Sequence, residues 1–314
     1  RKRNIKRSRK IEIKSKIDEV FIMSYFIGID IGGTNLRAAI ISKEGEVIDT
    51  FKTSNEVVNG AEHNLNKLVD HIKNQWKEYE VEKVGVGAPG PLDLKVGKIL
   101  NPPNLKGWEN FNIKEYLSEQ LNIPVKVNND ANVAGLAEAI VGAAKEAESV
   151  FYITISTGVG GGLILDKKLV NGAHSQAAEI YNMIINEDSY IQPGLNKSSL
   201  EGQCSGVNIA RIASAECSKE LSTKEVFDLY NKKDEKIVKI IEKWIDNIST
   251  GIANIITIVD PEVIVLGGAV PINNENLIPL VTEFVKSKVA DPNMVDIRVA
   301  KIGDNAGLIG AAML

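Results

Sequence analysis

A strand, a glycine-rich turn and a second strand occur twice in this chain, about 125 residues apart. The first copy joins predicted strands at 26–30 and 36–42 through Ile31-Gly32-Gly33-Thr34, and the second joins 150–155 and 163–166 through the small residues 156–162. Repetition of one supersecondary unit is typical of two related substructures. We therefore expect two lobes of similar design facing a cleft.

The length and composition agree with two lobes. The 314 residues, 44% of them apolar and 25% charged, allow two domains of about 150 residues each. No segment reaches the roughly 18 uncharged apolar residues that a membrane helix needs, because four glycines interrupt the best candidate at 150–165. Two cysteines and no signal peptide exclude a disulfide framework and predict a cytoplasmic protein without a membrane partner.

The first 22 residues differ in charge from the rest. They carry nine Lys/Arg and three Asp/Glu, so the remainder has a net charge of about −10. One interpretation is an arm that binds nucleic acid, and the other is a solvated appendage, native or not, outside the fold. The acidic remainder favours the appendage, and we expect no nucleic-acid partner.

Hydrophobic periodicity and capping residues predict the other elements. Strands are expected at 47–52, 81–86, 125–127, 263–266 and 297–302. Helices are expected at 61–78, 113–121, 131–147, 207–219, 234–258, 277–289 and 305–314, with another beginning at a capping box formed by Ser222 and Glu225.

The two glycine turns are candidate phosphate sites. Glycine tolerates positive φ and lets backbone N–H groups approach a phosphate closely. In the first turn Thr34 adds a hydroxyl and Asp30 could hold Mg²⁺ directly or through water, although a plain hairpin explains that turn equally well. The second turn, with four glycines at 158–162, favours a phosphate clamp made by one turn from each lobe. Gly267-Gly268, after a predicted buried strand, suits a nucleotide base or ribose.

Two common nucleotide motifs are excluded. Residues 85–90 match the GxGxxG pattern of dinucleotide-binding folds, but Pro89 and Pro91 prevent the helix that must follow it. The chain contains no GxxxxGK[ST] sequence, which excludes a P-loop enzyme.

Asp130 is the candidate general base. It lies between a predicted strand and a strong helix, where the helix dipole and free N–H groups favour an ionised carboxylate. Such a group can take the proton of a hydroxyl that attacks phosphorus. The alternative is a simple helix N-cap. The neighbouring Asn128 and Asn129 favour the catalytic interpretation, because side-chain amides commonly bind hydroxyl groups.

Taken together, four segments resemble the ROK sugar kinases, in the same order from about residue 23 to 314: Asp30-Ile-Gly-Gly-Thr34-Asn-Leu-Arg37, Asn129-Asp130, Ser156-Thr-Gly-Val-Gly-Gly-Gly162 and Asp260-Pro-Glu-Val-Ile-Val-Leu-Gly-Gly268. The resemblance implies an α/β, actin-like ATPase (ribonuclease H-like) fold, with two lobes around a central cleft. It also implies ATP-dependent phosphorylation of a hexose, usually at the 6-hydroxyl.

The resemblance assigns roles residue by residue. It makes Asp130 the base. It places Asn104, Asn129, Glu179 and Glu201 at the sugar, where Asn182 and Asp130 are also expected. It assigns ATP and its phosphates to Asp30, Gly32, Gly33, Thr34, Asn35, Arg37, Thr157, Gly158, Gly160, Gly267 and Gly268. ATP and Mg²⁺ are the expected cofactors, with Mg²⁺ near Asp30 and Asp130. The expected lobes are 23–128, with the helix at about 304–314 packed back on it, and 129–303.

One segment departs from the family pattern. Where the family carries a histidine and three zinc-binding cysteines, this chain has Asn182, Gln192, Gly194 and Ser199. The remaining His and Cys residues supply no tetrahedral set, so we expect no structural zinc. Packing and hydrogen bonds are expected to hold the loop before Glu201 instead.

The departure also affects the expected substrate. Family members without zinc resemble bacterial N-acetylmannosamine kinases, which places N-acetyl-D-mannosamine first, glucose second and other hexoses after them. A sugar-sensing ROK regulator is the alternative from another class, but it needs a DNA-binding domain of about 60 residues that we do not find. A glucan-binding or structural module leaves the glycine turns unexplained. Family habit suggests a homodimer or a tetramer.

Overall fold

The computed structural model describes residues 24–314, and the prediction for residues 1–22 lies outside them. The first of two large sheets has the strand order β3-β2-β1-β4-β7. The first three strands are antiparallel, and β4 and β7 run parallel to β1. The strands are β1 (Ser24–Ile31), β2 (Asn35–Ser42), β3 (Val47–Ser54), β4 (Glu80–Ala88) and β7 (Val125–Asn129).

The second sheet repeats this arrangement strand for strand. Its order is β10-β9-β8-β11-β12, again with an antiparallel trio followed by two parallel strands. The strands are β8 (Ser149–Ile155), β9 (Val159–Leu165), β10 (Lys168–Leu169), β11 (Val263–Gly267) and β12 (Ile297–Val299). The repeat predicted from the glycine turns therefore extends over whole sheets. A small hairpin of β5 (Leu92–Asp93) and β6 (Lys98–Ile99) was not predicted from the sequence.

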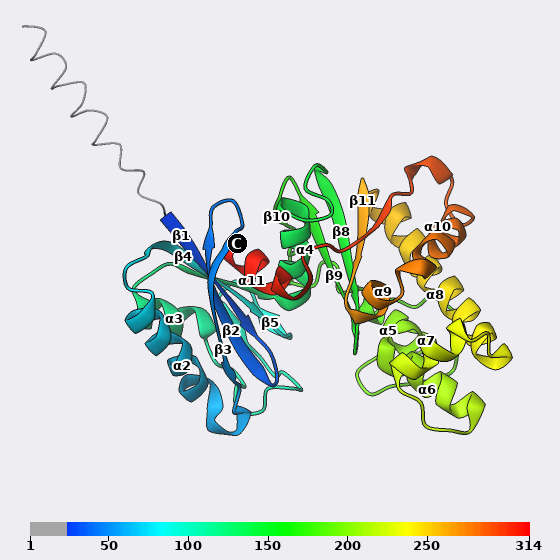
Figure 1. Cartoon of the computed structure of the whole chain (residues 1–314), viewed down its shortest axis with the longest axis horizontal. Helices are drawn as coiled ribbons and strands as arrows, with labels where there is room; N and C mark the ends of the chain where they lie inside the picture. The colour runs from blue at the N-terminus through cyan, green and yellow to red at the C-terminus, as the bar shows by residue number, and fades with distance from the viewer. Residues whose placement is uncertain (1–23) are drawn as a thin grey trace, which may run out of the picture.

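Helices cover both faces of the first sheet (Figure 1). On one face lie α2 (Gly60–Gln75), which follows the short helix η1 (Val57–Asn59), and α3 (Ile113–Leu121). On the other face α11 (Ala306–Ala312) packs against β1, β4 and α4 (Asp130–Ile140). Only glycine permits this approach, because a Cβ at Gly85 would lie 1.6 Å from the Ala311 carbonyl oxygen. The expected lobe boundary at 128/129 stays a prediction.

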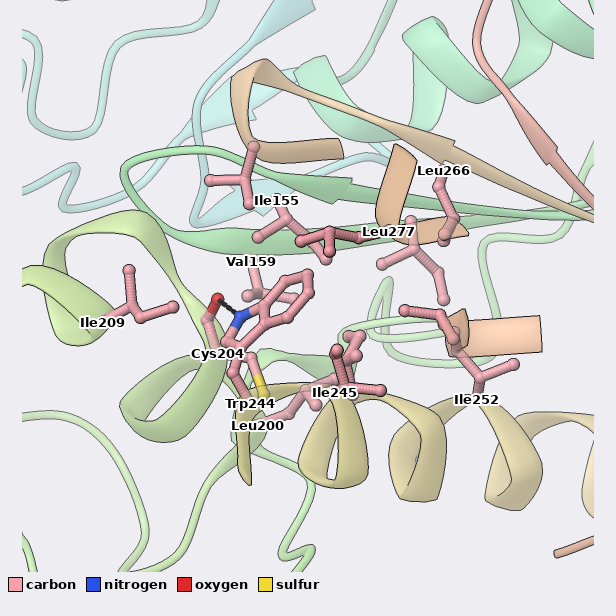
Figure 2. Close-up of a cluster of buried hydrophobic side chains, with 14 of the residues drawn as sticks. Ile155, Val159, Leu200, Cys204, Ile209, Trp244, Ile245, Ile252, Leu266 and Leu277 are labelled. Carbon is pink, nitrogen blue, oxygen red and sulfur yellow. Dashed lines mark hydrogen bonds between the residues drawn. The ribbon is translucent and has the colours of Figure 1, made fainter. Parts of the chain in front are cut away.

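The α4 helix also packs against β8 and β9, so it contacts both sheets. The opposite face of the second sheet is covered by helices of the chain's second half, among them η2 (Ile180–Asn182), α5 (Leu200–Cys204), α6 (Gly206–Cys217), α7 (Thr223–Asn231), α8 (Glu235–Val259), α9 (Ala269–Asn273), η3 (Glu275–Leu277), α10 (Ile278–Lys286) and η4 (Pro292–Met294). The short helix η5 (Gly303–Asn305) instead contacts α11. The capping box of Ser222 and Glu225 is present at α7. One side of α8 packs into a buried cluster with α5 and the sheet, part of which is drawn in Figure 2.

Two boundaries differ from expectation. The helix expected at 131–147 ends at Ile140, because the Glu138 carboxylate accepts the Ala143 N–H at 2.7 Å and the chain turns at Gly142. Gly160, Gly161 and Gly162 lie within β9 and not in the turn, which is limited to 156–158. Within residues 24–314, no helix has both the length and the apolar character to cross a membrane.

Candidate active site

Asp130 is the first residue of α4, directly after β7. The N-cap is the preceding residue, Asn129, whose side-chain oxygen accepts the Ala131 N–H at 2.9 Å. The Asp130 Oδ1 accepts the same N–H at 2.8 Å. Because Asn129 caps the helix, the simple capping interpretation of Asp130 is not needed, and its carboxylate is open to a cavity.

The pKa of Asp130 moves in the direction opposite to the one expected. Although Asp130 is exposed to the cavity, the protein around it limits its hydration and raises its pKa from 3.8 to about 6, and the negative charge of Asp30 contributes in the same direction. The hydrogen bond from Ala131 opposes this change but is outweighed. At pH 7 the group is still ionised by about ten to one, and a pKa near the working pH suits a general base.

A cavity of about 580 Å³ brings together residues from both sheets and α11. Four predicted residues line it, namely Asp30, Arg37, Asp130 and Gly268. Seven further lining residues were not predicted from the sequence: Glu138, Tyr152, Thr154, Ala269, Asn273, Asp304 and Gly307. Several of these follow the ends of β11 and β12. The rule that ligands bind at the carboxyl ends of parallel strands could have identified them.

Asp30 and Arg37 face each other across β1 and β2 and form an ion pair. Arg37 donates from Nε at 3.0 Å and from its terminal nitrogen at 2.6 Å, both to Oδ2 of Asp30. Oδ1 of Asp30 is left for other ligands. Gly307 leaves space beside it, because a Cβ there would lie 3.4 Å from Oδ1.

These groups fit a Mg²⁺ ion that arrives with a nucleotide. Within residues 24–314, no three His, Cys, Asp or Glu side chains are grouped to hold a metal by themselves. Mg²⁺ commonly takes one or two carboxylates, with phosphates and water as the other ligands. Asp30, and Asp130 when ionised, could supply that carboxylate part.

Two further carboxylates, those of Glu179 and Glu201, lie outside the set of residues that line this cavity. Glu201, in the first turn of α5, accepts the Val159 N–H at 2.8 Å and lies against Gly158, where a Cβ would be 2.6 Å from Oε2. Burial raises the pKa of Glu201 and of Glu179, and the charge of Asp130 adds to the effect on Glu179. Burial also raises the pKa of Tyr181, and the charges of both glutamates add to that effect. Asp130 thus lines the cavity and is also close enough to Glu179 for its charge to act on that carboxylate.

The glycine turns have a structural explanation that the sequence did not reveal. Of the predicted phosphate-binding glycines only Gly268, with φ of 84°, has the positive φ that was expected. A Cβ on Gly160 would lie 2.9 Å from that of Ala131, so this glycine lets β9 pack against α4. Gly267 similarly leaves room for the Tyr152 hydroxyl. The first turn closes through the Gly32 N–H, which donates to the Asn35 carbonyl at 2.9 Å, and Gly33 and Thr157 are exposed.

The two remaining residues that were predicted to bind the sugar, Asn104 and Asn182, do not line this cavity. Asn104 is exposed in a loop and lies against Gly33. Asn182 has its side-chain oxygen occupied by the backbone N–H of Asn196. Their roles, like those of the phosphate turns, stay predictions.

Comparisons with known proteins agree with this geometry. The family model of the ROK family matches residues 26–314, and the chain belongs to that family. N-acetylmannosamine kinase of Haemophilus influenzae (strain PittGG) is 31% identical over 289 residues, which are 91% of this chain and 93% of that protein.

Solved structures are similar over the same length. The ROK hexokinase from Thermus thermophilus is 30% identical with a TM-score of 0.85, over 92% of this chain and 97% of that one. A ROK family glucokinase from Streptomyces griseus, solved with glucose and AMPPNP, is 26% identical with a TM-score of 0.74. The match covers 92% of this chain and 98% of the glucokinase. The resemblance to ROK kinases and the expected actin-like fold are confirmed.

Proposed function

We propose that this protein transfers the γ-phosphoryl group of ATP to the 6-hydroxyl of a hexose, and that N-acetyl-D-mannosamine is its preferred substrate. The reaction class expected from the sequence, that of a sugar kinase, is confirmed by the relatives named as sugar kinases. The position of phosphorylation, the sugar and the residue roles are the proposal.

The observation that carries the proposal is that Asp130 lines a cavity formed by both sheets while its charge acts on Glu179, which together with Glu201 acts on Tyr181. A sugar hydroxyl that approaches Asp130 from the direction of Glu179 and Glu201 faces a nucleotide bound in the cavity. Asp130 accepts the hydroxyl proton as the oxygen attacks phosphorus. Asn129 fixes the start of α4, while Glu179 and Glu201 accept hydrogen bonds from other sugar hydroxyls. Mg²⁺, when bound, would offset negative charge on the phosphates.

The preference for N-acetyl-D-mannosamine is supported by one feature and one relative. Asn182 stands where zinc-binding family members carry histidine. Its side-chain oxygen accepts a hydrogen bond from the Asn196 N–H, so only its NH₂ group can donate to a sugar. The Haemophilus relative is named an N-acetylmannosamine kinase. Glucose is the second candidate, because the Streptomyces glucokinase shares the fold and was solved with glucose.

A panel of hexoses in a coupled assay of ADP release tests the proposal. We expect the highest kcat/KM for N-acetyl-D-mannosamine, with Mg²⁺ required. Higher kcat/KM for glucose would overturn the ranking. Sugar binding without ADP release from any member of the panel would overturn phosphoryl transfer and favour the regulator.

We further propose a cytoplasmic homodimer, the common habit of the family. Sedimentation equilibrium checks this, because a chain of 34.2 kDa would give twice that mass. A mass equal to one chain at micromolar concentration would contradict it.

A further inference from the structure

Glu201 stands at the start of a five-residue helix that follows a long loop, residues 183–199. Such a short helix cannot hold its own position, because it contains little more than one turn of hydrogen bonds. Its inner side is anchored: Leu200 and Cys204 are fully buried, and the Trp244 indole donates to the Cys204 carbonyl at 2.9 Å (Figure 2). The side that carries Glu201 needs a separate support.

That support comes from Asn208 on α6, which is only 2% exposed. The two hydrogens of its NH₂ group are shared among three acceptors, the backbone carbonyl of Glu201 at 3.0 Å, the Gln192 side chain at 3.0 Å and the Ser205 hydroxyl at 2.9 Å. A single amide therefore connects the residue that bears the carboxylate with the loop before it.

Arg211 extends the same support by one helical turn. Its Nε donates to the side-chain oxygen of Asn208 at 3.0 Å, which fixes the orientation of that amide. Its terminal nitrogen donates to the Gly202 carbonyl at 3.2 Å, and its guanidinium lies 3.4 Å from the ring centroid of Tyr190 in the loop. Through these contacts Arg211 and Asn208 hold α6 against α5 and against residues 190–192 of the loop.

The loop has its own polar contacts at the positions where the sequence departs from the family pattern. Asn182 accepts from Asn196, Gln192 from Asn208, and Ser199 from the Gly202 N–H at 3.2 Å. These contacts join the loop to itself, to α5 and to α6.

We propose that Asn208, oriented by Arg211, is a positioning residue for Glu201: it holds α5 and the 183–199 loop so that the Glu201 carboxylate meets the Val159 N–H and the sugar. The inference rests on the proposed function for the sugar contact. The contact between Glu201 and Val159 does not depend on it.

The Asn208→Asp variant tests this with little change in volume. Aspartate keeps the acceptor for Arg211 but cannot donate to the Glu201 carbonyl or to Gln192. Asn64→Asp is the matched control. Asn64 is fully buried in α2, and its NH₂ group donates to the carbonyls of Glu56 and Gly60 at 2.9 and 2.7 Å.

Hydrogen exchange of the Val159 amide is the first measurement, because this N–H bonds directly to Glu201. We expect faster exchange of the 157–163 peptide in Asn208→Asp and in Glu201→Ala, and wild-type exchange there in Asn64→Asp. The second measurement is steady-state kinetics with N-acetyl-D-mannosamine and glucose. Asn208→Asp should raise the KM for the sugar about tenfold, the equivalent of one hydrogen bond, with the KM for ATP unchanged.

Two results would overturn the proposal. One is an Asn208→Asp protein whose melting temperature falls while Val159 exchange and sugar KM stay at wild-type values, since Asn208 would then be structural only. The other is slower exchange of the loop on adding Zn²⁺, or faster exchange with EDTA, since a metal would then hold the loop. If the exchange result holds and no sugar is phosphorylated, the positioning of Glu201 stands and the proposed function fails.

Discussion

At Asp130 two physical effects oppose each other. The N–H groups at the start of α4 favour the charged carboxylate, as the sequence suggested, but removal from water and the charge of Asp30 favour the neutral form. The two effects that favour the neutral form outweigh the N–H groups, because Asp130 lines a cavity whose walls come from both sheets, an environment that no local sequence pattern reveals. The result is a carboxylate whose pKa of about 6 matches proton transfer near neutral pH.

Replacing Asp130 with Asn should separate activity from stability. We expect kcat to fall about 10²- to 10⁴-fold with sugar binding kept, because the base is lost and the shape is not. In the wild type, kcat should fall as the pH drops through about 6. Coupled assays from pH 5 to 8 measure both, and a variant with wild-type kcat would refute the assignment.

The same substitution should raise thermal stability. The folded pKa lies above the ordinary 3.8, so between these values the folded state binds more protons and stability falls as pH rises through about 6. The asparagine side chain cannot ionise, so we expect the variant to have a higher melting temperature than wild type at pH 8 and a smaller difference at pH 5. Calorimetry at the two pH values checks the sign.

His71 should make the fold sensitive to mild acid. It stacks on Phe51 with ring centroids 3.9 Å apart, and its Nε2 is buried without a partner. Burial lowers its pKa below 6.5 despite the charge of Asp49. The unfolded state therefore takes up more protons below pH 6.5, and stability falls as pH falls. We expect His71→Phe to flatten the decline in melting temperature between pH 7.5 and 5.5.

The exposed His63 provides the control for that experiment. His63→Gln removes an exposed imidazole in place of the partly buried one and is melted over the same pH range. An equal flattening in both variants would contradict the role of His71.

At the scale of elements, α4 illustrates how tertiary contacts override a local pattern. The alanine-rich segment favours a helix to 147, and helix propensity alone contains no reason to stop at Ile140. The reason is Glu138, which is fully buried and accepts the N–H groups of Ala143, Lys301 and Ile302 at 2.7, 2.9 and 2.9 Å. The carboxylate ends the helix and ties it to the segment that leads into α11.

Glu138→Gln should therefore destabilise the protein by about 3 kcal/mol, because its NH₂ group would face a backbone N–H and leave buried donors unpaired. Glu262 is the matched control: it accepts two backbone N–H groups, from Glu148 and Ser149, but is exposed. Glu262→Gln should cost under about 1 kcal/mol. Urea unfolding measures both, and equal losses would contradict the importance of burial at Glu138.

At the scale of the whole molecule, two sheets of one design meet around α4 and α11. The cavity takes residues from both sheets and from α11, so a ligand in it contacts structures that are far apart in sequence. We expect AMPPNP and N-acetyl-D-mannosamine together to lower the radius of gyration by drawing the lobes closer. Small-angle scattering measures this, with each ligand alone as control, and identical curves in all states would contradict closure.

The sequence alone determined the repeated strand–turn–strand unit, most elements to within a few residues, the helix start at Asp130 and the family. These follow from local periodicity, capping residues and glycine-rich motifs, which act over short stretches of chain. Tertiary structure alone decided the end of α4, the pKa of Asp130, the packing role of Gly160 and the support of Glu201 by Asn208. Each of these depends on groups from distant segments, whose burial and close contact exist only once the two sheets are assembled.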